Sequence, residues 1–137
     1  MSISSGPPVA AIFNTSPDTV DLLRGVLSRA GFVVVTGFTF DIRDAKINID
    51  DFMGQHKPDV VVYDIAPPYD ENCRLFAHLR QIPAFERCPV VLTSTNIARV
   101  EPLLAKGQAI YEIVGKPYDL GIIVQAVKEA SRSRLTR

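Results

Sequence analysis

Val60-Val61-Val62-Tyr63-Asp64 is the stretch that decides the fold, and Ile65-Ala66-Pro67-Pro68 follows it directly. A short continuous run of apolar residues, without polar alternation, is typical of a strand that is buried on both faces of a parallel sheet. In such sheets, ligands and chemistry gather at the edge where the strands end. The stretch therefore predicts a buried strand that carries the carboxylate of Asp64 to that edge.

Four other apolar runs predict the remaining strands, at residues 9–13, 32–35, 89–94 and 110–114. Segments with apolar residues at helical spacing lie between these runs, so that five strands alternate with five helices. This alternation predicts an α/β fold with a parallel sheet covered on both sides.

Local signals set the expected ends of the helices in the first half of the chain. Ser16-Pro17-Asp18 supplies an N-cap, a proline at the first helical position and an acid in the first turn. Gly31 stands where this helix should end. Residues 37–46 show no clean period and are expected to be a loop or an irregular helix, and a short helix is expected around residues 50–53.

In the second half of the chain, Leu75, Phe76, Leu79 and Ile82 predict a helix that Pro83 stops. A short helix is expected from Val100 to Lys106, with Gly107 at its end. Asp119 is expected to cap the last helix.

Composition indicates one folded domain. The chain has 137 residues, 47% of them apolar, and fifteen basic residues balance fifteen acidic ones. This balance argues against nucleic acid or an anionic membrane as a partner. Cys73 and Cys88 form no metal or redox motif, and neither a signal peptide nor a membrane span is predicted. We expect a cytoplasmic domain over residues 9–132, with tails at 1–8 and 133–137.

Several separated motifs occur in a particular order. They are Pro17-Asp18, Lys57-Pro58-Asp59, Asp64 with Pro68 four residues on, the Thr93/Ser94 hydroxyl pair, and Lys116-Pro117-Tyr118. In this order, over roughly residues 8–132, the chain resembles the receiver domain of two-component response regulators. The resemblance implies a flavodoxin-like, doubly wound five-stranded parallel sheet of order 2-1-3-4-5, with helices on both faces.

The resemblance also implies a chemistry. In the family, a kinase histidine passes a phosphoryl group to the aspartate that Asp64 matches, and Mg²⁺ offsets the negative charge. Lys116 would stabilise the transferred group, and a hydroxyl of Ser94 or Thr93 would bind one of its oxygens. The spacing from Pro89 favours Ser94 for this role.

The chain departs from the family pattern after the first strand. Two adjacent acids that hold the metal are replaced by Asn14 and Thr15. With only Asp64 as a carboxylate ligand, Mg²⁺ binding is expected to be weak. The aromatic residue usual three positions before Lys116 is also replaced, here by Ile113.

Three functions follow as hypotheses. The first is a stand-alone receiver in a phosphorelay with Asp64 as phosphoacceptor. The second is a pseudo-receiver that binds proteins without phosphorylation. The remote third is a flavin or phosphate binder that uses the Asn14-Thr15-Ser16 loop at a helix N-terminus. No catalytic set is visible, so the chain is not expected to be an enzyme.

The expected partners follow from the same resemblance. A histidine kinase or phosphotransfer protein would act on Asp64, or a downstream protein would dock on residues 96–132. A homodimer through the last helix stays open as an alternative.

Overall fold

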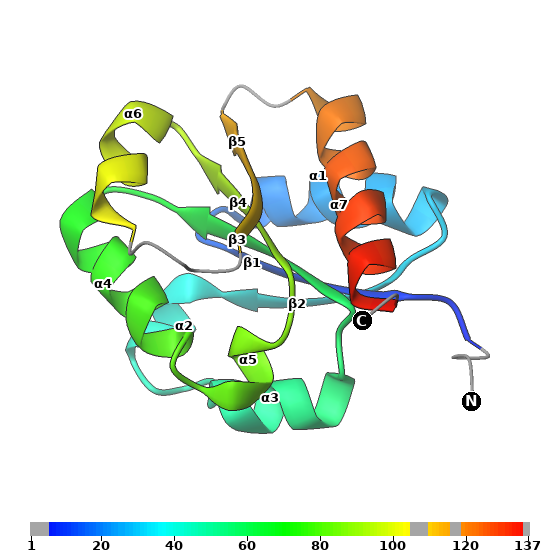
Figure 1. Cartoon of the computed structure of the whole chain (residues 1–137), viewed down its shortest axis with the longest axis horizontal. Coiled ribbons are helices and arrows are strands. Elements are labelled where there is room, and N and C mark those ends of the chain that lie inside the picture. The colour runs from blue at the N-terminus through cyan, green and yellow to red at the C-terminus, as the bar shows by residue number, and fades with distance from the viewer. Residues whose placement is uncertain (1–5, 105–109, 116–118, 136–137) are drawn as a thin grey trace.

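The computed structural model describes residues 6–104, 110–115 and 119–135, with the side chains of 110–115 and 133–135 left out of the description. A central parallel sheet lies between two layers of helices (Figure 1). Its five strands have the order β2-β1-β3-β4-β5. They are β1 (Val9–Asn14), β2 (Val33–Phe38), β3 (Val60–Ile65), β4 (Val90–Ser94) and β5 (Ile110–Gly115). The predicted α/β fold with a parallel sheet is confirmed.

The described residues form seven α-helices and one 3-10 helix, η1, rather than the five helices expected. The helices are α1 (Pro17–Arg29), α2 (Thr39–Arg43), α3 (Ile49–His56), α4 (Tyr69–Leu79), α5 (Pro83–Glu86), α6 (Ile97–Val100), η1 (Glu101–Leu103) and α7 (Leu120–Leu135). None of the described helices is long and apolar enough to cross a membrane.

Each face of the sheet has its own apolar core. Helices α1 and α7 cover one face, where Leu23, Leu27 and Val127 pack on alternate residues of the inner strands. Helices α2 to α6 contribute to the core on the other face. The two sets interleave along each strand because successive side chains of a strand point to opposite faces.

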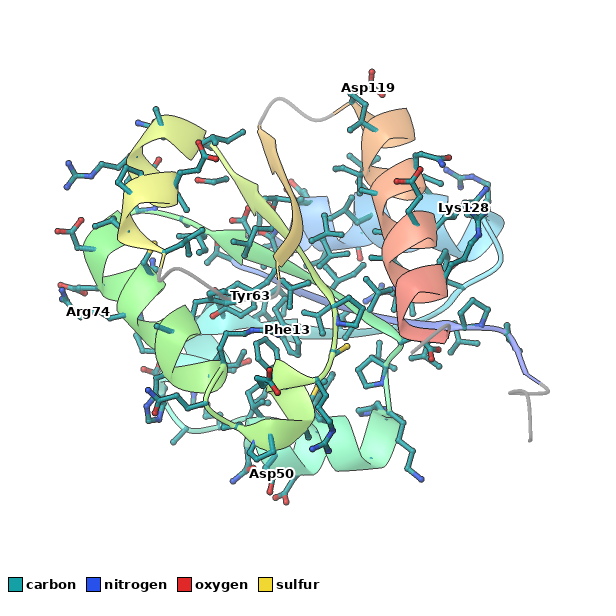
Figure 2. The ribbon with its side chains drawn as sticks, in the orientation of Figure 1. Phe13, Asp50, Tyr63, Arg74, Asp119 and Lys128 are labelled. Atoms are coloured by element: carbon teal, nitrogen blue, oxygen red, sulfur yellow. The ribbon has the colours of Figure 1, made fainter. Side chains whose placement is uncertain are left out.

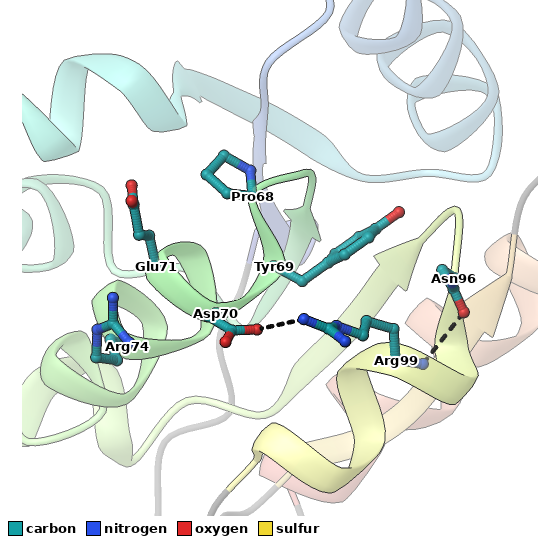
Figure 3. A pocket seen from close by; sticks show the side chains of 7 residues that line it. All are labelled: Pro68, Tyr69, Asp70, Glu71, Arg74, Asn96 and Arg99. Atoms are coloured by element: carbon teal, nitrogen blue, oxygen red, sulfur yellow. Dashed lines mark hydrogen bonds and ion pairs between the residues drawn. The ribbon is translucent and has the colours of Figure 1, made fainter.

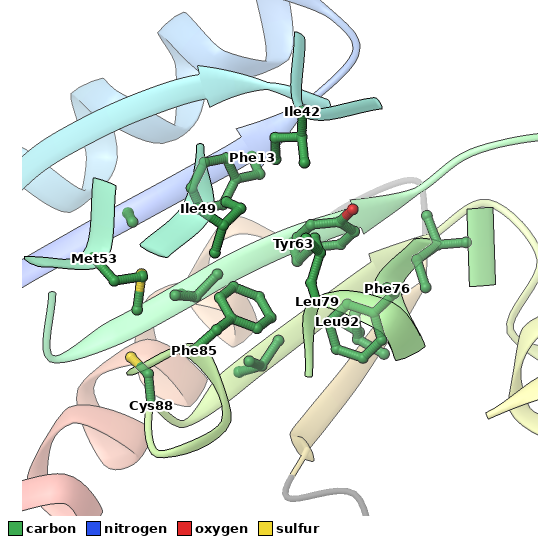
Figure 4. Packing of buried hydrophobic residues seen from close by; sticks show 14 of the residues in the cluster. Phe13, Ile42, Ile49, Met53, Tyr63, Phe76, Leu79, Phe85, Cys88 and Leu92 are labelled. Carbon is green, nitrogen blue, oxygen red and sulfur yellow. The ribbon is translucent and has the colours of Figure 1, made fainter. Parts of the chain in front are cut away.

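Aromatic rings fill much of the second core. Tyr63 lies 6.1 Å from Phe13 and 5.0 Å from Phe76, measured between ring centroids, and Phe85 meets Phe76 edge to face (Figure 4). Phe13 and Tyr63 lie in the interior, whereas the labelled charged side chains lie at the periphery (Figure 2). Tilted and edge-on ring pairs of this kind are favoured in protein cores.

The predicted N-caps of α1 and α7 are confirmed. Ser16 Oγ accepts a hydrogen bond of 3.3 Å from the backbone N–H of Thr19 at the start of α1. Asp119 Oδ1 accepts one of 3.2 Å from the N–H of Ile122 at the start of α7. Both side chains satisfy a donor that the first turn of a helix leaves without a backbone partner.

The end of α1 is also as predicted. Gly31 has φ of 102°, a conformation that residues with a Cβ rarely adopt. The N–H of Phe32 bonds to the carbonyl of Leu27, and the N–H of Gly31 bonds to the carbonyl of Ser28, each at 3.1 Å. These paired bonds form a Schellman motif, which closes the helix and turns the chain into β2.

The prediction that a helix runs up to Pro83 is wrong. Helix α4 begins at Tyr69 and ends at Leu79, and Pro83 begins α5 instead. A proline fits the first position of a helix because its missing N–H has no helical partner there. The preceding Ile82 is extended, with φ −77° and ψ 118°, as residues before proline generally are.

The helix expected from Val100 to Lys106 begins earlier. Asn96 caps α6 through a 3.1 Å bond from the N–H of Arg99 to Asn96 Oδ1. The chain tightens into η1 around Pro102 and becomes extended at Leu104. Lys106 and Gly107 lie outside the described residues.

The segment without a clear period contains regular structure. Strand β2 runs on to Phe38, well beyond the predicted residues 32–35, and α2 follows it. A Cβ at position 37 would lie 2.9 Å from Ile47 Cδ1 and 3.0 Å from Phe13 Cε1, so Gly37 permits this close approach. The short helix expected around residues 50–53 is part of α3.

We predict opposite effects for the same substitution at two glycines. Gly31→Ala should lower the free energy of unfolding by about 1–2 kcal/mol, because alanine must adopt a left-handed conformation there. Gly54→Ala, inside α3 with nothing within 4 Å of the added Cβ, should raise it by about 0.5–1 kcal/mol. Urea unfolding of both variants measures the two changes in the free energy of unfolding. Changes of the same sign would contradict the assignment of Gly31 as the left-handed residue that ends α1.

Candidate functional site

Three polar side chains lie at the ends of adjacent strands, on the face of the sheet that α1 and α7 cover. Ile12, Val62 and Val91 belong to the core on that face. Two residues further along each strand stand Asn14, Asp64 and Thr93. Because side chains two apart share a face, these polar groups lie at the carboxyl edge of adjacent strands on the same face. This is the edge at which the sequence places the site.

Asp64 is buried and hydrogen-bonded to its neighbour. Its side chain is 3% exposed, and Thr93, its partner in the strand register, is fully buried. Thr93 Oγ1 donates to Asp64 Oδ1 at 2.6 Å. A hydrogen bond that short stabilises a carboxylate removed from water.

Asn14 uses its side-chain oxygen within its own loop. The residue is 1% exposed, and Oδ1 accepts from the backbone N–H of Thr15 at 2.7 Å and of Ser16 at 3.1 Å. An amide oxygen has two lone pairs, so these bonds use its accepting capacity. Thr15 is exposed. For Asn14 to bind a metal through this oxygen, the loop amides would have to lose their acceptor.

The hydroxyl beside Asp64 is that of Thr93, although the spacing from Pro89 favours Ser94. Ser94 pairs with Ile65 in the register and therefore points to the opposite face of the sheet. Its Oγ accepts a hydrogen bond of 3.2 Å from the backbone N–H of Asn96. The contact with Asp64 is therefore made by Thr93, and the predicted role of Ser94 in binding a phosphoryl oxygen stays a prediction.

The predicted partner Lys116 lies outside the described residues, as do Pro117 and Tyr118, so the contact of Lys116 with Asp64 stays a prediction. Position 113 falls in β5, but the side chain of Ile113 is likewise outside the description. Among the residues whose side chains are described, no three His, Cys, Asp or Glu residues come together as metal ligands would.

A groove beside this edge was not foreseen from the sequence (Figure 3). It has a volume of about 670 Å³ and is lined by Pro68, Tyr69, Asp70, Glu71, Arg74, Asn96 and Arg99. The hydroxyls of Tyr69 and Thr95 share a hydrogen bond of 2.6 Å. Arg99 Nη2 pairs with Asp70 Oδ1 at 3.1 Å. These contacts join the start of α4 to the start of α6.

Burial is the main cause of a raised pKa at two nearby groups, Tyr63 and Cys73. It raises the pKa of the Tyr63 phenol, and the adjacent Asp64 carboxylate and Cys73 thiol raise it further. Burial also raises the pKa of the Cys73 thiol, with the Asp70 carboxylate adding to the effect. Both groups therefore stay protonated near neutral pH, and neither is a ready nucleophile.

A buried arginine on the other side of the molecule is structural. Arg80 Nη1 donates to the carbonyls of Phe85 at 2.8 Å and of Cys88 at 3.0 Å. Burial lowers the pKa of this guanidinium, and its carbon centre lies 5.5 Å from the Phe85 ring centroid. Arg80 thereby holds α5 and the chain leading to β4 against the end of α4.

The fold matches solved receiver structures. A sensor protein of a Polaromonas species has a TM-score of 0.76 at 19% identity, covering 93% of this chain and 98% of that one. The signal receiver domain of an HD domain-containing protein from Pseudomonas fluorescens has a TM-score of 0.75 at 15% identity, with coverages of 96% and 99%. A response regulator from Thermotoga maritima has a TM-score of 0.68 at 19% identity, with coverages of 92% and 98%.

These likenesses show that the chain has the fold of response-regulator receiver domains. No family model and no curated protein sequence matches the chain. The named activities belong to those proteins, and the role of this chain has to be argued from its own residues.

We predict that the two neighbouring hydroxyls differ in their contribution to stability. Thr93→Val should lower the free energy of unfolding by about 1–3 kcal/mol, because it removes a donor to a buried carboxylate. Thr93→Ser, which keeps the hydroxyl, should recover part of this loss. Ser94→Ala should cost about 1 kcal/mol or less, since it removes one bond to a backbone N–H. Urea unfolding of the three variants gives the ranking, and a larger cost for Ser94→Ala would reverse the assignment.

Proposed function

We propose that the protein is a pseudo-receiver: a signalling module with the receiver fold that acts by docking to a partner protein, with Asp64 as a buried structural acid. The observation that carries the proposal is the side chain of Asn14. It stands where a metal-binding acid would be needed, and its oxygen already serves the N–H groups of Thr15 and Ser16.

The electrostatics support this proposal. Phosphoryl transfer to Asp64 would bring a dianionic group beside a carboxylate, and Mg²⁺ normally offsets that charge. Asn14 and Thr15 add no negative charge to hold a cation. Asp64 is also buried and already accepts from Thr93. A phosphoryl donor would have to reach Asp64 without the Mg²⁺ ion that usually offsets the charge.

The proposed docking surface is the segment 96–132, as the sequence suggests. Among the described residues of this segment, Leu103 is 39% exposed and Ile122 is 49% exposed. Contiguous exposed apolar patches mark surfaces that bind other proteins, and we propose that these two side chains contribute to such a patch. A downstream signalling protein is therefore the partner that we propose.

A working phosphoacceptor in a phosphorelay is the second candidate. The position of Asp64 at the carboxyl edge of β3, with the Thr93 hydroxyl at 2.6 Å, favours it. In that case a histidine kinase or a phosphotransfer protein would be the partner. A phosphate or flavin binder at the Asn14-Thr15-Ser16 loop is disfavoured, because Asn14 occupies two of the amides that would bind the anion.

Incubation with acetyl phosphate and Mg²⁺, followed by intact-mass measurement, separates the two candidates. We expect no phosphoryl adduct on the wild-type protein, so that it matches the Asp64→Ala variant. An adduct on the wild-type protein that Asp64→Ala abolishes would establish the phosphoacceptor instead.

A variant with restored acids is the matched control. Asn14→Asp combined with Thr15→Asp should increase Mg²⁺ affinity by at least about tenfold, because hard carboxylate oxygens replace an engaged amide and a hydroxyl. Calorimetric titration measures this change. Unaltered Mg²⁺ affinity would contradict the assignment of positions 14 and 15 to the metal edge.

A further inference from the structure

The turn between β4 and α6 is fixed by its own side chains. We call residues 93–96 the β4–α6 corner. Thr93 bonds to Asp64, and Ser94 accepts from the N–H of Asn96. Thr95 bonds to Tyr69, and Asn96 caps the first turn of α6. Every side chain in the corner therefore makes a hydrogen bond, and each goes to a different group.

The first turn of α4 reaches this corner through two adjacent residues. Figure 3 shows Tyr69 and Asp70 extending from α4 toward the β4 end and α6. The Tyr69 hydroxyl lies 2.6 Å from Thr95 Oγ1, and Asp70 Oδ1 lies 3.1 Å from Arg99 Nη2. The ion pair is exposed and contributes little by itself. The shorter hydroxyl bond is made by a ring that also packs on the apolar core.

Helix α6 depends on such contacts because it buries little of its own. It has four residues, of which only Val100 is buried. A helix this short is not stable by its backbone bonds alone. Its position is therefore set by the packing of Val100 in the core and by the corner that precedes it.

We propose that Tyr69 is a positioning residue that holds the β4–α6 corner, and with it α6, in one conformation whatever the state of Asp64. The inference rests on the proposed function, since α6 is the first helix of the docking surface 96–132. Tyr69 would keep that end of the surface in its docking form without any modification of Asp64. The sheet supports this separation, because Asp64 and Thr93 continue the core of one face while Tyr69 and Val100 pack with the other.

Amide hydrogen exchange tests the proposal. Tyr69→Phe keeps the ring and removes the hydroxyl, and Thr95→Val keeps the shape of the other partner. Each should speed exchange of the hydrogen-bonded amides of Arg99, Val100 and Leu104 about fivefold, the effect of losing one hydrogen bond. The double variant should show no more than either single variant, because both remove the same bond.

Two variants serve as controls. Asp64→Asn should leave these exchange rates within about twofold of the wild type, because its neighbour Thr93 still has an oxygen to bond with. Asp21→Asn removes an exposed 3.1 Å ion pair with Arg24 on α1 and should also leave α6 unchanged. The amides of Gly31 and Phe32, which close α1, report any global loss of stability.

Three results would overturn the proposal. Unchanged exchange at Arg99, Val100 and Leu104 in Tyr69→Phe would show that the hydroxyl does not hold the corner. An equal rise of these exchange rates in Asp64→Asn would show that Asp64, rather than Tyr69, determines the conformation of α6. A rise at Gly31 and Phe32 equal to that in α6 would show only global destabilisation. A phosphoryl adduct on the wild-type protein would refute the pseudo-receiver function without altering these rates.

Discussion

The burial of β3 is the constraint on which the rest of the structure depends. All six of its residues are buried, so the strand requires a neighbour on each side and helices on both faces. Its last residues include Asp64, whose carboxylate must find hydrogen-bond donors inside the protein, since removal from water would otherwise be costly. The bond from Thr93 on the adjacent strand meets part of that need. The site is thus a product of the same pairing that builds the sheet.

Much of the fold could be predicted because its causes are local. Apolar runs without alternation identify buried strands, and Ser16, Gly31 and Asp119 mark helix ends through their own hydrogen bonds or conformation. The role of Pro83 does not follow from the sequence, because proline is equally suited to ending one helix and beginning the next. The full length of β2 does not follow from the sequence either, because residues 36–38 show no clear apolar pattern.

The candidate site was predictable in position and less so in detail. Asp64 follows from the end of an apolar run, whereas the choice of Thr93 over Ser94 depends on which face each residue takes in the sheet. The contact of Tyr69 with Thr95 joins residues 26 apart in the sequence. No local pattern signals such a contact, because it arises only when two strands lie side by side and their following loops converge.

Because side chains alternate along β4, the sheet separates the two apolar cores from each other. Thr93 belongs to the compartment under α1 and α7, whereas Val100 belongs to the compartment on the opposite side. A change at the Asp64 carboxylate has two routes to α6, through Thr93 and residues 94–96, or through residues 65–68 to Tyr69, whose hydroxyl bonds to Thr95. Both routes lead into the β4–α6 corner, whose four side chains are hydrogen-bonded, so a change at Asp64 would have to break some of these bonds before α6 moved.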